Sequence, residues 1–292
     1  NILFTSAGRR VELLRAFREA YRTLGIKGKL IATDINPLAP ALYVADESYI
    51  VPPCHDPTFI PTLINICGKE KINLLFPLID PEIPLLASNR EEIEKATGTK
   101  VVVVSKDAAA ITSDKWQTYK FFNQLSIPTP RTWLPEELSK LQLTYPLFIK
   151  PRFGSAGKNC FKINNQKELF FFLDYVPSPI VQEYLEGPEI TSDVICDFEG
   201  KVLGIVSRQR ITVRAGEVEK GVTIYDPQII AYCVDIAHSL GAIGPITVQC
   251  IVKNKQPYFT EINPRFGGGV PLGIKAGIRS PEWLLSIACG LP

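Results

Sequence analysis

Short apolar runs alternate with amphipathic helical patterns through the first third of the chain, and this alternation limits the possible folds more than any other feature. Strands that alternate with helices across short connections form parallel sheets with helices on both faces. The predicted strands are Ile2–Thr5, Leu30–Thr33, Ser48–Val51, Leu74–Pro77 and Val101–Val104, and the predicted helices are Arg10–Leu24, Thr58–Glu70 and Pro81–Thr97. We therefore expect an N-terminal α/β domain with a doubly wound parallel sheet over residues 1–112.

After residue 112 the strands are spaced as in hairpins. A helix over Ser113–Leu125 should end before Pro128, because the residue before a proline avoids helical backbone angles. Further strands are predicted at Leu147–Lys150, Phe161–Ile163, Ile180–Tyr184, Thr191–Asp197, Lys201–Arg210, Thr247–Val252 and Tyr258–Asn263, with helices at Gln166–Tyr175 and Pro227–Leu240. This pattern predicts a mostly antiparallel α+β domain with a small lobe over residues 113–185 and a large lobe over residues 186–292.

The composition argues against several functions. The 32 basic and 30 acidic residues give a net charge of +2 and form no basic block, so a nucleic-acid partner is not expected. No apolar run approaches the roughly 20 residues that span a bilayer, and the start of the chain has no signal-peptide pattern. The cysteines are dispersed without a Cys-x-x-Cys pair, and His55 and His238 are too few for a histidine-based zinc site. We expect a cytoplasmic protein that does not bind membranes.

Two further features affect how the motifs are interpreted. The sequence contains no methionine, although average usage would supply several, so some spacings between motifs are expected to be one residue short. The chain ends at Pro292, soon after an expected helix, and we expect a further C-terminal segment to follow.

The stretch from Tyr258 to Gly269 carries the strongest chemical signal. Alternation along a strand places Glu261 and Asn263 on one face, and Arg265 continues the same alternation if the strand geometry persists through Pro264. Carboxylate and amide oxygens suit a hard cation such as Mg²⁺, and the guanidinium would add a positive charge beside it for a triphosphate. The alternative is a strand end with a solvated polar edge.

A second signal is the segment Phe148-Ile149-Lys150-Pro151-Arg152-Phe153-Gly154-Ser155-Ala156-Gly157. A strand delivers Lys150 into a loop of small residues whose N–H groups could turn toward a phosphate. The P-loop pattern is absent, because this lysine precedes the glycines. The alternative is a glycine hairpin with a solvated lysine.

Weaker signals lie elsewhere. The strand before Leu185 leads to Glu189, which could accept hydrogen bonds from a ribose, although a domain linker would have the same sequence. Lys115 falls in the first turn of a predicted helix, where a cation is mildly unfavourable. The charged segment Arg208–Gly221 is a candidate lid, in which Arg210, Arg214 and Lys220 could face a ligand or solvent.

Taken together and in this order, these segments resemble the ATP-grasp superfamily, most closely a single ATP-grasp unit of the carbamoyl phosphate synthetase large subunit. The most specific parts are Lys150 before the Gly154–Gly157 loop, and Glu261-Ile262-Asn263-Pro264-Arg265 preceded by Gln249. The resemblance implies a pre-ATP-grasp domain followed by two lobes that grip ATP. It assigns nucleotide contacts to Lys115, Lys150, Gly154, Ser155, Gly157, Glu183, Tyr184, Leu185 and Glu189, metal contacts to Gln249, Glu261 and Asn263, and catalytic roles to Arg265, Lys150 and Arg210.

The resemblance also implies a function. We expect a ligase that uses ATP and Mg²⁺, with Mn²⁺ as a substitute, to activate a small carboxylate as an acyl phosphate for attack by an amine or ammonia. The alternatives are a non-catalytic nucleotide sensor or structural partner and, less favoured, an oxidoreductase, since Gly-x-Gly-x-x-Gly is absent. The chain has one ATP-grasp unit where the full synthetase subunit has two, so carbamoyl phosphate synthesis is not expected. A homodimer is one expected assembly.

The resemblance also implies that the N-terminal domain contributes substrate contacts, and Asp80 and Glu82, just after the predicted strand Leu74–Pro77, are candidates. The strand-to-helix turn that contains Ser6 has amides that could bind an anion. Each side chain has an alternative structural role, because Ser and Asp at these positions could cap the following helices.

Overall fold

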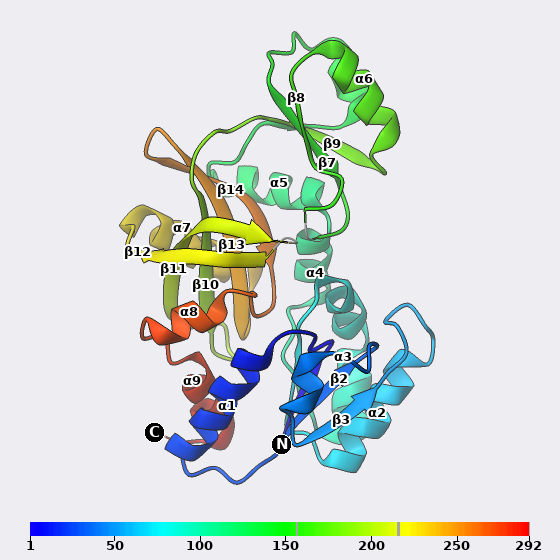
Figure 1. The fold of residues 1–292 in the computed structure, drawn as a ribbon, viewed down its shortest axis with the longest axis vertical. Helices are drawn as coiled ribbons and strands as arrows, with labels where there is room; N and C mark the ends of the chain where they lie inside the picture. Colours follow the sequence, from blue (N-terminus) through cyan, green and yellow to red (C-terminus); the bar gives the residue numbers. More distant parts are fainter. Residues whose placement is uncertain (156, 215–216, 292) are drawn as a thin grey trace.

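Three β-sheets follow one another along the long axis of the molecule (Figure 1). The computed structural model describes residues 1–155, 157–214 and 217–291. The N-terminal sheet lies at the bottom of Figure 1, a large antiparallel sheet lies above it, and a small sheet lies at the top.

The N-terminal sheet is parallel with the strand order β3-β2-β1-β4-β5. Its elements are β1 (Ile2–Thr5), α1 (Val11–Thr23), β2 (Leu30–Asp34), η1 (Pro40–Tyr43), β3 (Glu47–Ile50), α2 (Phe59–Glu70), β4 (Leu74–Pro77), η2 (Asp80–Glu82), α3 (Ile83–Thr97) and β5 (Lys100–Val101). Helices α2 and α3 pack on one face and α1 packs on the other, which confirms the predicted doubly wound sheet. The strand order reverses between β1 and β4, where such sheets commonly bind ligands at the carboxyl ends of the strands.

The rest of the chain forms the two other sheets and their helices. Two helices, α4 (Lys106–Ser113) and α5 (Lys115–Gln124), lead to the small sheet, whose order is β6-β9-β7-β8. Its elements are β6 (Thr132–Trp133), η3 (Pro135–Lys140), β7 (Leu147–Pro151), β8 (Phe161–Ile163), α6 (Gln166–Tyr175) and β9 (Pro179–Glu183). The large sheet has the order β12-β11-β10-β13-β14 and comprises β10 (Glu189–Cys196), β11 (Val202–Arg214), β12 (Glu217–Ile224), β13 (Pro245–Lys253) and β14 (Gln256–Asn263), with α7 (Pro227–Leu240), α8 (Val270–Lys275) and α9 (Ser280–Cys289).

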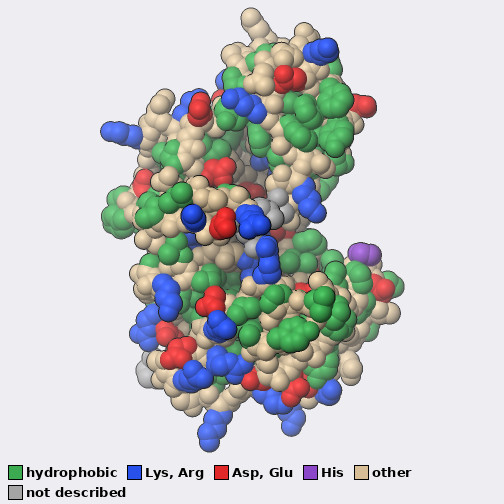
Figure 2. All heavy atoms as spheres, in the orientation of Figure 1, with side chains coloured by type: hydrophobic (Ala, Val, Ile, Leu, Met, Phe, Trp, Pro, Cys, Tyr) green, Lys and Arg blue, Asp and Glu red, His purple; other side chains and the backbone are tan. Residues whose placement is uncertain are grey.

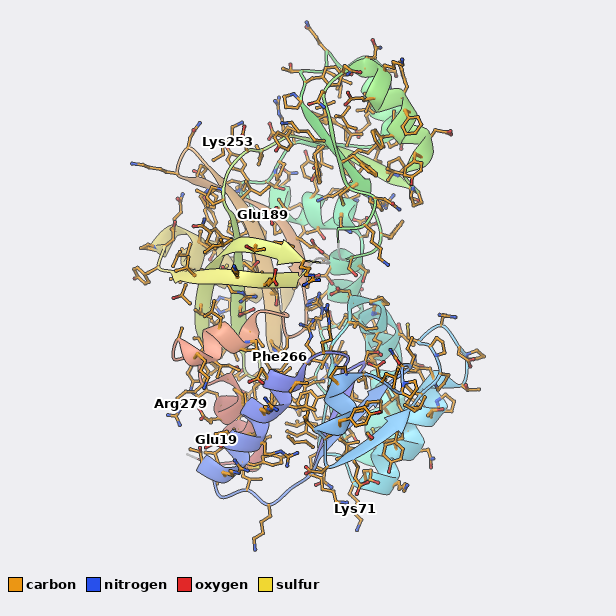
Figure 3. All side chains as sticks on the ribbon, in the orientation of Figure 1. Glu19, Lys71, Glu189, Lys253, Phe266 and Arg279 are labelled. Carbon is orange, nitrogen blue, oxygen red and sulfur yellow. The ribbon has the colours of Figure 1, made fainter. Side chains whose placement is uncertain are left out.

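The cores join the N-terminal and large sheets but leave the small sheet separate. Buried side chains on both faces of the N-terminal sheet cluster with side chains of the large sheet and its helices. Phe266 belongs to one of these clusters, with its ring 5.8 Å from that of Phe17 and 5.6 Å from that of Phe76 between centroids. Figure 3 shows Phe266 where the large sheet meets α1. The small sheet has a core of its own.

Several elements differ from the prediction. The valine run after Lys100 is buried as far as Val104, but only Lys100–Val101 pairs as a strand. The β-branched side chains of this run reflect its burial, and burial does not require strand pairing. The helix predicted from Ser113 begins at Lys115, since the Asp114 carboxylate accepts a hydrogen bond from the Trp116 N–H (2.9 Å) and caps it. Helix α4 and strands β6 and β12 were not predicted.

The predicted divisions at residues 112 and 185 place one sheet in each part, and we propose them as the domain boundaries.

Within the described ranges, none of the helices combines the length and the apolar character that a membrane crossing requires.

Candidate active site

A cavity of about 1110 Å³ lies between the small sheet and the large sheet. Every residue to which the resemblance assigns a nucleotide, metal or catalytic role lines it: Lys115, Lys150, Gly154, Ser155, Gly157, Glu183, Tyr184, Leu185, Glu189, Arg210, Gln249, Glu261, Asn263 and Arg265. Figure 2 shows acidic and basic side chains together around the hollow beneath the small upper part of the molecule. The volume is sufficient for a nucleotide together with a second small ligand.

Three candidate metal ligands lie together on β13 and β14. The antiparallel register pairs Gln249 with Glu261, and alternation along β14 brings Asn263 to the same face. Asn263 is buried, so this end of β14 is not a fully solvated edge.

The donor chemistry of this face fits magnesium. The Asn263 side-chain amide lies 3.2 Å from Oε1 of Glu261, and it donates a hydrogen bond there when its nitrogen faces that oxygen. Turned over, the amide would direct its oxygen to the same place, so that oxygens of Asn263 and Glu261 converge. One carboxylate with neutral oxygens suits Mg²⁺, which also retains water and phosphate ligands. Throughout the described ranges no group of three or more His, Cys, Asp or Glu side chains could hold a metal, so a zinc-type centre is not found there.

Lys150 stands at the end of β7 and is only 7% exposed, so it is not the solvated lysine of the alternative interpretation. Burial lowers its pKa from 10.5 to about 8, with the nearby Lys115 acting in the same direction and Glu261 opposing both. A buried ammonium that is weakly held in its charged form gains most from a bound anion.

We expect the affinity of the cavity for ATP to fall as the pH rises above 8. Bound phosphates favour the protonated lysine, so the affinity for ATP is highest below the lysine pKa of about 8. The affinity should drop about tenfold between pH 7 and pH 9, and above pH 8 binding should be accompanied by uptake of a proton. Isothermal titration in two buffers of different ionisation enthalpy would measure both quantities. Lys150→Arg should show no such decline, whereas Lys150→Ala should bind weakly at every pH. An affinity that Lys150→Ala leaves unchanged would remove this residue from the site.

The glycine loop that follows Lys150 is tied to α5. Gly154 and Gly157 have φ angles of +100° and +65°, which side-chain-bearing residues rarely adopt. The Lys115 ammonium donates a hydrogen bond to the carbonyl oxygen of Gly154 (2.5 Å), so the cation in the first helical turn holds this loop. The Arg152 guanidinium forms a two-pronged pair with the Asp114 carboxylate (2.6 and 2.7 Å). Ala156, the remaining residue of the predicted loop, lies outside the described residues.

The predicted adenine side of the cavity lies at the end of β9. The Glu183 carboxylate accepts a hydrogen bond from the Arg131 N–H (2.9 Å), so its side chain is engaged within the sheet. The Lys162 ammonium lies 4.2 Å from the centre of the Tyr184 ring, and Leu185 is buried. This end of the cavity therefore combines an aromatic ring and an apolar side chain, which suit a base.

Glu189 and Arg210 face each other across neighbouring strands. Their side chains form an ion pair (3.2 Å) in which the glutamate is 53% exposed and the arginine 11% exposed. Figure 3 shows Glu189 at the upper end of the large sheet, below the small sheet. A carboxylate in this position can still accept hydrogen bonds from a ribose, because more than half of its surface is free.

The predicted lid, Arg208–Gly221, lies in a β-hairpin formed by β11 and β12. Its predicted start at Arg208 was wrong. Arg208 is 2% exposed and pairs with the buried Asp193, so it is part of the core. Arg214 lies near the tip, with its guanidinium 3.9 Å from the Glu219 carboxylate. Ala215 and Gly216, which the predicted lid includes, lie outside the described residues.

The buried Asp193–Arg208 pair was missed by the sequence analysis. It lies directly beneath the glycines that follow Arg265: a Cβ at Gly269 would overlap the Arg208 guanidinium, and one at Gly267 would lie 2.9 Å from the Thr247 hydroxyl. The run of glycines therefore reflects close packing over a buried ion pair. The run of glycines was the sequence feature that could have indicated this close packing.

Arg265 connects the cavity with the N-terminal sheet. Its Nη2 donates to Oδ2 of Asp80 (2.7 Å), and its Nη1 donates to the Phe266 carbonyl oxygen (3.2 Å). Asp80 does not cap a helix, since η2 and α3 have no side-chain cap. The structural alternative for Asp80 is therefore wrong.

Glu82 lies at the switch point of the N-terminal sheet. Its carboxylate accepts hydrogen bonds from the hydroxyls of Thr5 and Ser6, both at 2.5 Å, so Ser6 does not cap α1. Burial raises the pKa of Glu82 to about 7; the two hydroxyl groups oppose the shift, and Asp34 adds to it.

This raised pKa predicts a pH-dependent stability. Between pH 4.5 and about 7 the folded protein binds the Glu82 proton more tightly than the unfolded chain, so the contribution of this group to stability is present at low pH and lost as the pH rises through about 7. A shift of this size corresponds to about 3 kcal/mol. Glu82→Gln removes the titration, and urea unfolding at pH 4.5 and pH 8 should show it gaining stability over the wild type by about that amount. A constant difference between the two proteins would contradict the assignment.

Comparisons with known proteins agree with this geometry. A PylC-like N-terminal domain model matches residues 2–102, and an ATP-grasp domain model matches residues 112–269. The chain is 26% identical to the carbamoyl phosphate synthase large chain of Thermoanaerobacter sp. (strain X514) over 93% of its own length, and 27% identical to that of Thermoanaerobacter pseudethanolicus (strain ATCC 33223 / 39E) over 96%. It spans only 26% and 27% of the lengths of these two relatives.

Solved structures share the fold. The L-amino acid ligase from Bacillus licheniformis has a TM-score of 0.75 and 19% identity over 99% of this chain and 73% of its own. The biotin carboxylase domain dimer of the Hydrogenobacter thermophilus 2-oxoglutarate carboxylase has a TM-score of 0.75 and 19% identity over 99% of this chain and 69% of its own. The N5-carboxyaminoimidazole ribonucleotide synthetase from Thermus thermophilus has the same TM-score, 0.75, and the same identity, 19%, over 100% of this chain and 79% of its own.

The ATP-grasp domain model covers more than half of the 292 residues and includes both walls of the cavity, so the chain belongs to the ATP-grasp family.

Proposed function

We propose that the chain is an ATP- and Mg²⁺-dependent ligase that activates a small carboxylate as an acyl phosphate for attack by an amine or ammonia. The observation that carries the proposal is the pairing of opposite chemistries across one cavity. Cationic groups of Lys115 and Lys150 line one wall, and oxygen donors of Gln249, Glu261 and Asn263 line the other. A triphosphate with its counterions requires both sets together.

In this arrangement the nucleotide base would lie against Tyr184 and Leu185, with the ribose near Glu189. The phosphates would lie between the glycine loop and β14, where Lys150 neutralises their charge. Mg²⁺, or Mn²⁺ in its place, would be held by Gln249, Glu261 and Asn263 and would shield the phosphate oxygens from an attacking anion.

The first chemical step would be phosphoryl transfer. A carboxylate oxygen of the substrate attacks the γ-phosphorus of ATP, the bond from that phosphorus to the β,γ-bridging oxygen breaks, and ADP leaves with the bonding electrons. Negative charge accumulates on the transferred group, and we assign its stabilisation to Arg265, with Lys150 and Arg210 as further cations.

The second step would be acyl transfer. The nitrogen lone pair of an amine attacks the acyl carbon, phosphate leaves, and the nitrogen loses a proton. Because an acyl phosphate hydrolyses readily, the site must exclude water between the two steps. The position of the cavity between two sheets supports this requirement, since closing them together would cover the intermediate.

Two classes of carboxylate are candidate substrates. The names of structural neighbours point to bicarbonate, which accompanies MgADP in the Hydrogenobacter thermophilus structure, and to amino acids, the substrates that name the Bacillus licheniformis ligase. We extend both classes to this chain as candidates, together with a homodimer as in the first of these structures.

The deciding experiment is a screen for ADP formation with ATP and Mg²⁺. One arm supplies bicarbonate with ammonia, and the other supplies pairs of amino acids. We expect ADP release that requires both an acid and an amine. Tight ATP binding without acid-dependent ADP release in either arm would instead support a non-catalytic nucleotide sensor.

A further inference from the structure

Asp80 is the N-terminal sheet's direct contact with the proposed phosphoryl-transfer site. It begins η2, just beyond the carboxyl end of β4, and its side chain is 25% exposed. One of its oxygens, Oδ2, accepts the Arg265 hydrogen bond described above. Arg265 itself is 14% exposed and lines the cavity, so the pair is largely shielded from water and screening by salt is weak.

The other oxygen of Asp80 contacts a proposed metal ligand. With the Asn263 amide nitrogen directed toward it, Oδ1 of Asp80 accepts a hydrogen bond of 3.0 Å while the same nitrogen reaches Glu261. A single carboxylate therefore touches both Asn263, at the end of β14, and Arg265, two residues beyond it. Any change in its charge reaches the phosphoryl site and the metal site together.

The segment that carries Asp80 is held in place by hydrogen bonds and packing. Two residues further on, Glu82 is buried and hydrogen bonded to Thr5 and Ser6. Phe266, the residue after Arg265, packs in the aromatic cluster of the N-terminal core. The guanidinium is thus held between two anchored points, as positioning of a catalytic group requires.

We propose that Asp80 is a positioning residue, through which the N-terminal sheet orients Arg265 for phosphoryl transfer; this inference rests on the ATP-dependent function proposed above. Asp80 acts through Arg265 and does not itself bind the nucleotide. The competing explanation is that the pair only tethers the two parts of the molecule.

The test compares two ligands that differ in the transferred group. ADP with Mg²⁺ fills the nucleotide site, whereas ADP with Mg²⁺ and tetrafluoroaluminate adds a planar mimic of the phosphoryl group. Asp80→Asn should change the affinity for ADP less than about twofold and should lower the affinity for the fluoroaluminate complex about tenfold. Calorimetric titration measures both affinities without requiring the acid or amine substrate.

A double-mutant comparison identifies the route of the effect. If Asp80 acts through Arg265, the Asp80→Asn change should alter the fluoroaluminate affinity less than about twofold in the Arg265→Lys protein. An undiminished effect in that background would overturn the proposal, as would an equal loss of affinity for both ligands in the Asp80→Asn protein.

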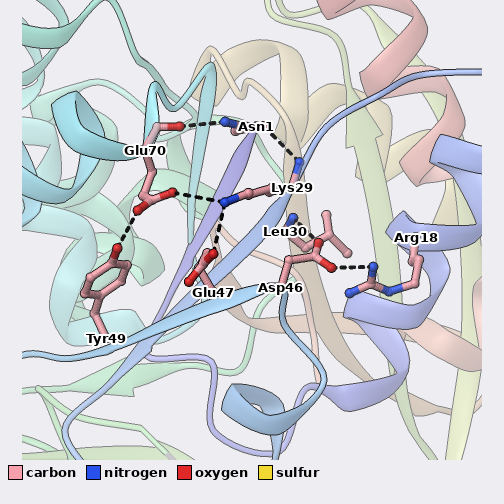
Figure 4. Close-up of polar contacts among 8 residues, drawn as sticks. All are labelled: Asn1, Arg18, Lys29, Leu30, Asp46, Glu47, Tyr49 and Glu70. Atoms are coloured by element: carbon pink, nitrogen blue, oxygen red, sulfur yellow. Dashed lines mark hydrogen bonds and ion pairs between the residues drawn. The ribbon is translucent and has the colours of Figure 1, made fainter.

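The chain provides a matched control in Asp46, which directly precedes the edge strand β3 of the same sheet. Figure 4 shows Asp46, whose carboxylate pairs with Arg18 at 2.8 Å and accepts a hydrogen bond from the Leu30 N–H at the start of β2. Its pair has exposures of 33% and 31%, so Asp46→Asn also removes a charge from a partly shielded ion pair.

Asp46→Asn should leave both affinities unchanged, and a loss equal to that of Asp80→Asn would overturn the positioning role. If the wild-type protein binds no ADP, the proposed function fails and this inference fails with it. If the wild type binds both ligands and Asp80→Asn does not discriminate between them, only this inference fails.

Discussion

Glu261→Gln is expected to reduce turnover about a thousandfold while the protein remains folded. Glu261 is the only carboxylate among the three proposed metal ligands, and the charge stabilisation supplied through a metal is worth several kcal/mol, at about 1.4 kcal/mol for each factor of ten. The change keeps the shape of the side chain, so the β13–β14 register should persist. ADP release under saturating ATP and Mg²⁺, together with a thermal unfolding curve, would measure both expectations.

The same substitution should affect Lys150. Glu261 raises the pKa of that lysine against the effect of burial, so its removal should lower the pKa further below about 8. Glu219→Gln is a suitable control, because Glu219 belongs to the same sheet and pairs with Arg214 near the hairpin tip. Full activity in Glu261→Gln would count strongly against the metal site.

Asp193→Ala is expected to destabilise the fold by about 3–5 kcal/mol, because it leaves the buried Arg208 guanidinium without its counterion. Both side chains of this pair are 2% exposed, so water cannot replace the lost carboxylate. Burial raises the pKa of Asp193, although Arg208 opposes the shift. Urea unfolding monitored by circular dichroism would measure the loss.

The double variant Asp193→Ala with Arg208→Met tests this explanation. Removing both charges should restore part of the stability, since a buried ion pair can be replaced by apolar groups at little cost. A double variant less stable than Asp193→Ala alone would show that the arginine stabilises the fold by packing beneath Gly267 and Gly269 rather than through its charge.

Local patterns predicted the longer elements well. The helix expected at Pro227–Leu240 has those bounds, because Asp226 caps its start and Gly241 adopts the left-handed conformation at its end. The two-residue strand β6, the eight-residue strand β12 and the helix α4 were missed. A two-residue strand such as Thr132–Trp133 has no period to detect and depends on its partner Gln182, fifty residues away.

The site was predictable to the extent that its motifs are local. Glu261 and Asn263 alternate along β14, so their common face follows from strand geometry alone, whereas Arg265 lies two residues beyond the end of that strand. The bond from Arg265 to Asp80 spans 185 positions in the sequence. Asp193 and Arg208 are related by the register of β10 and β11. Such pairs are set by tertiary packing, which no local pattern encodes.

The separate core of the small sheet has a thermodynamic consequence. Because its buried side chains do not merge with the two larger clusters, a rotation of this sheet would leave the apolar packing of those clusters unchanged. The hydrogen bonds between the glycine loop and α5 would have to adjust. A ligand that bridges the cavity would restrict that rotation, and its binding would be opposed mainly by lost rigid-body entropy and only slightly by reorganisation of apolar contacts. Native-state hydrogen exchange would then report the small sheet as an independent cooperative unit, which opens more readily than the N-terminal strands and whose protection rises with ligand concentration.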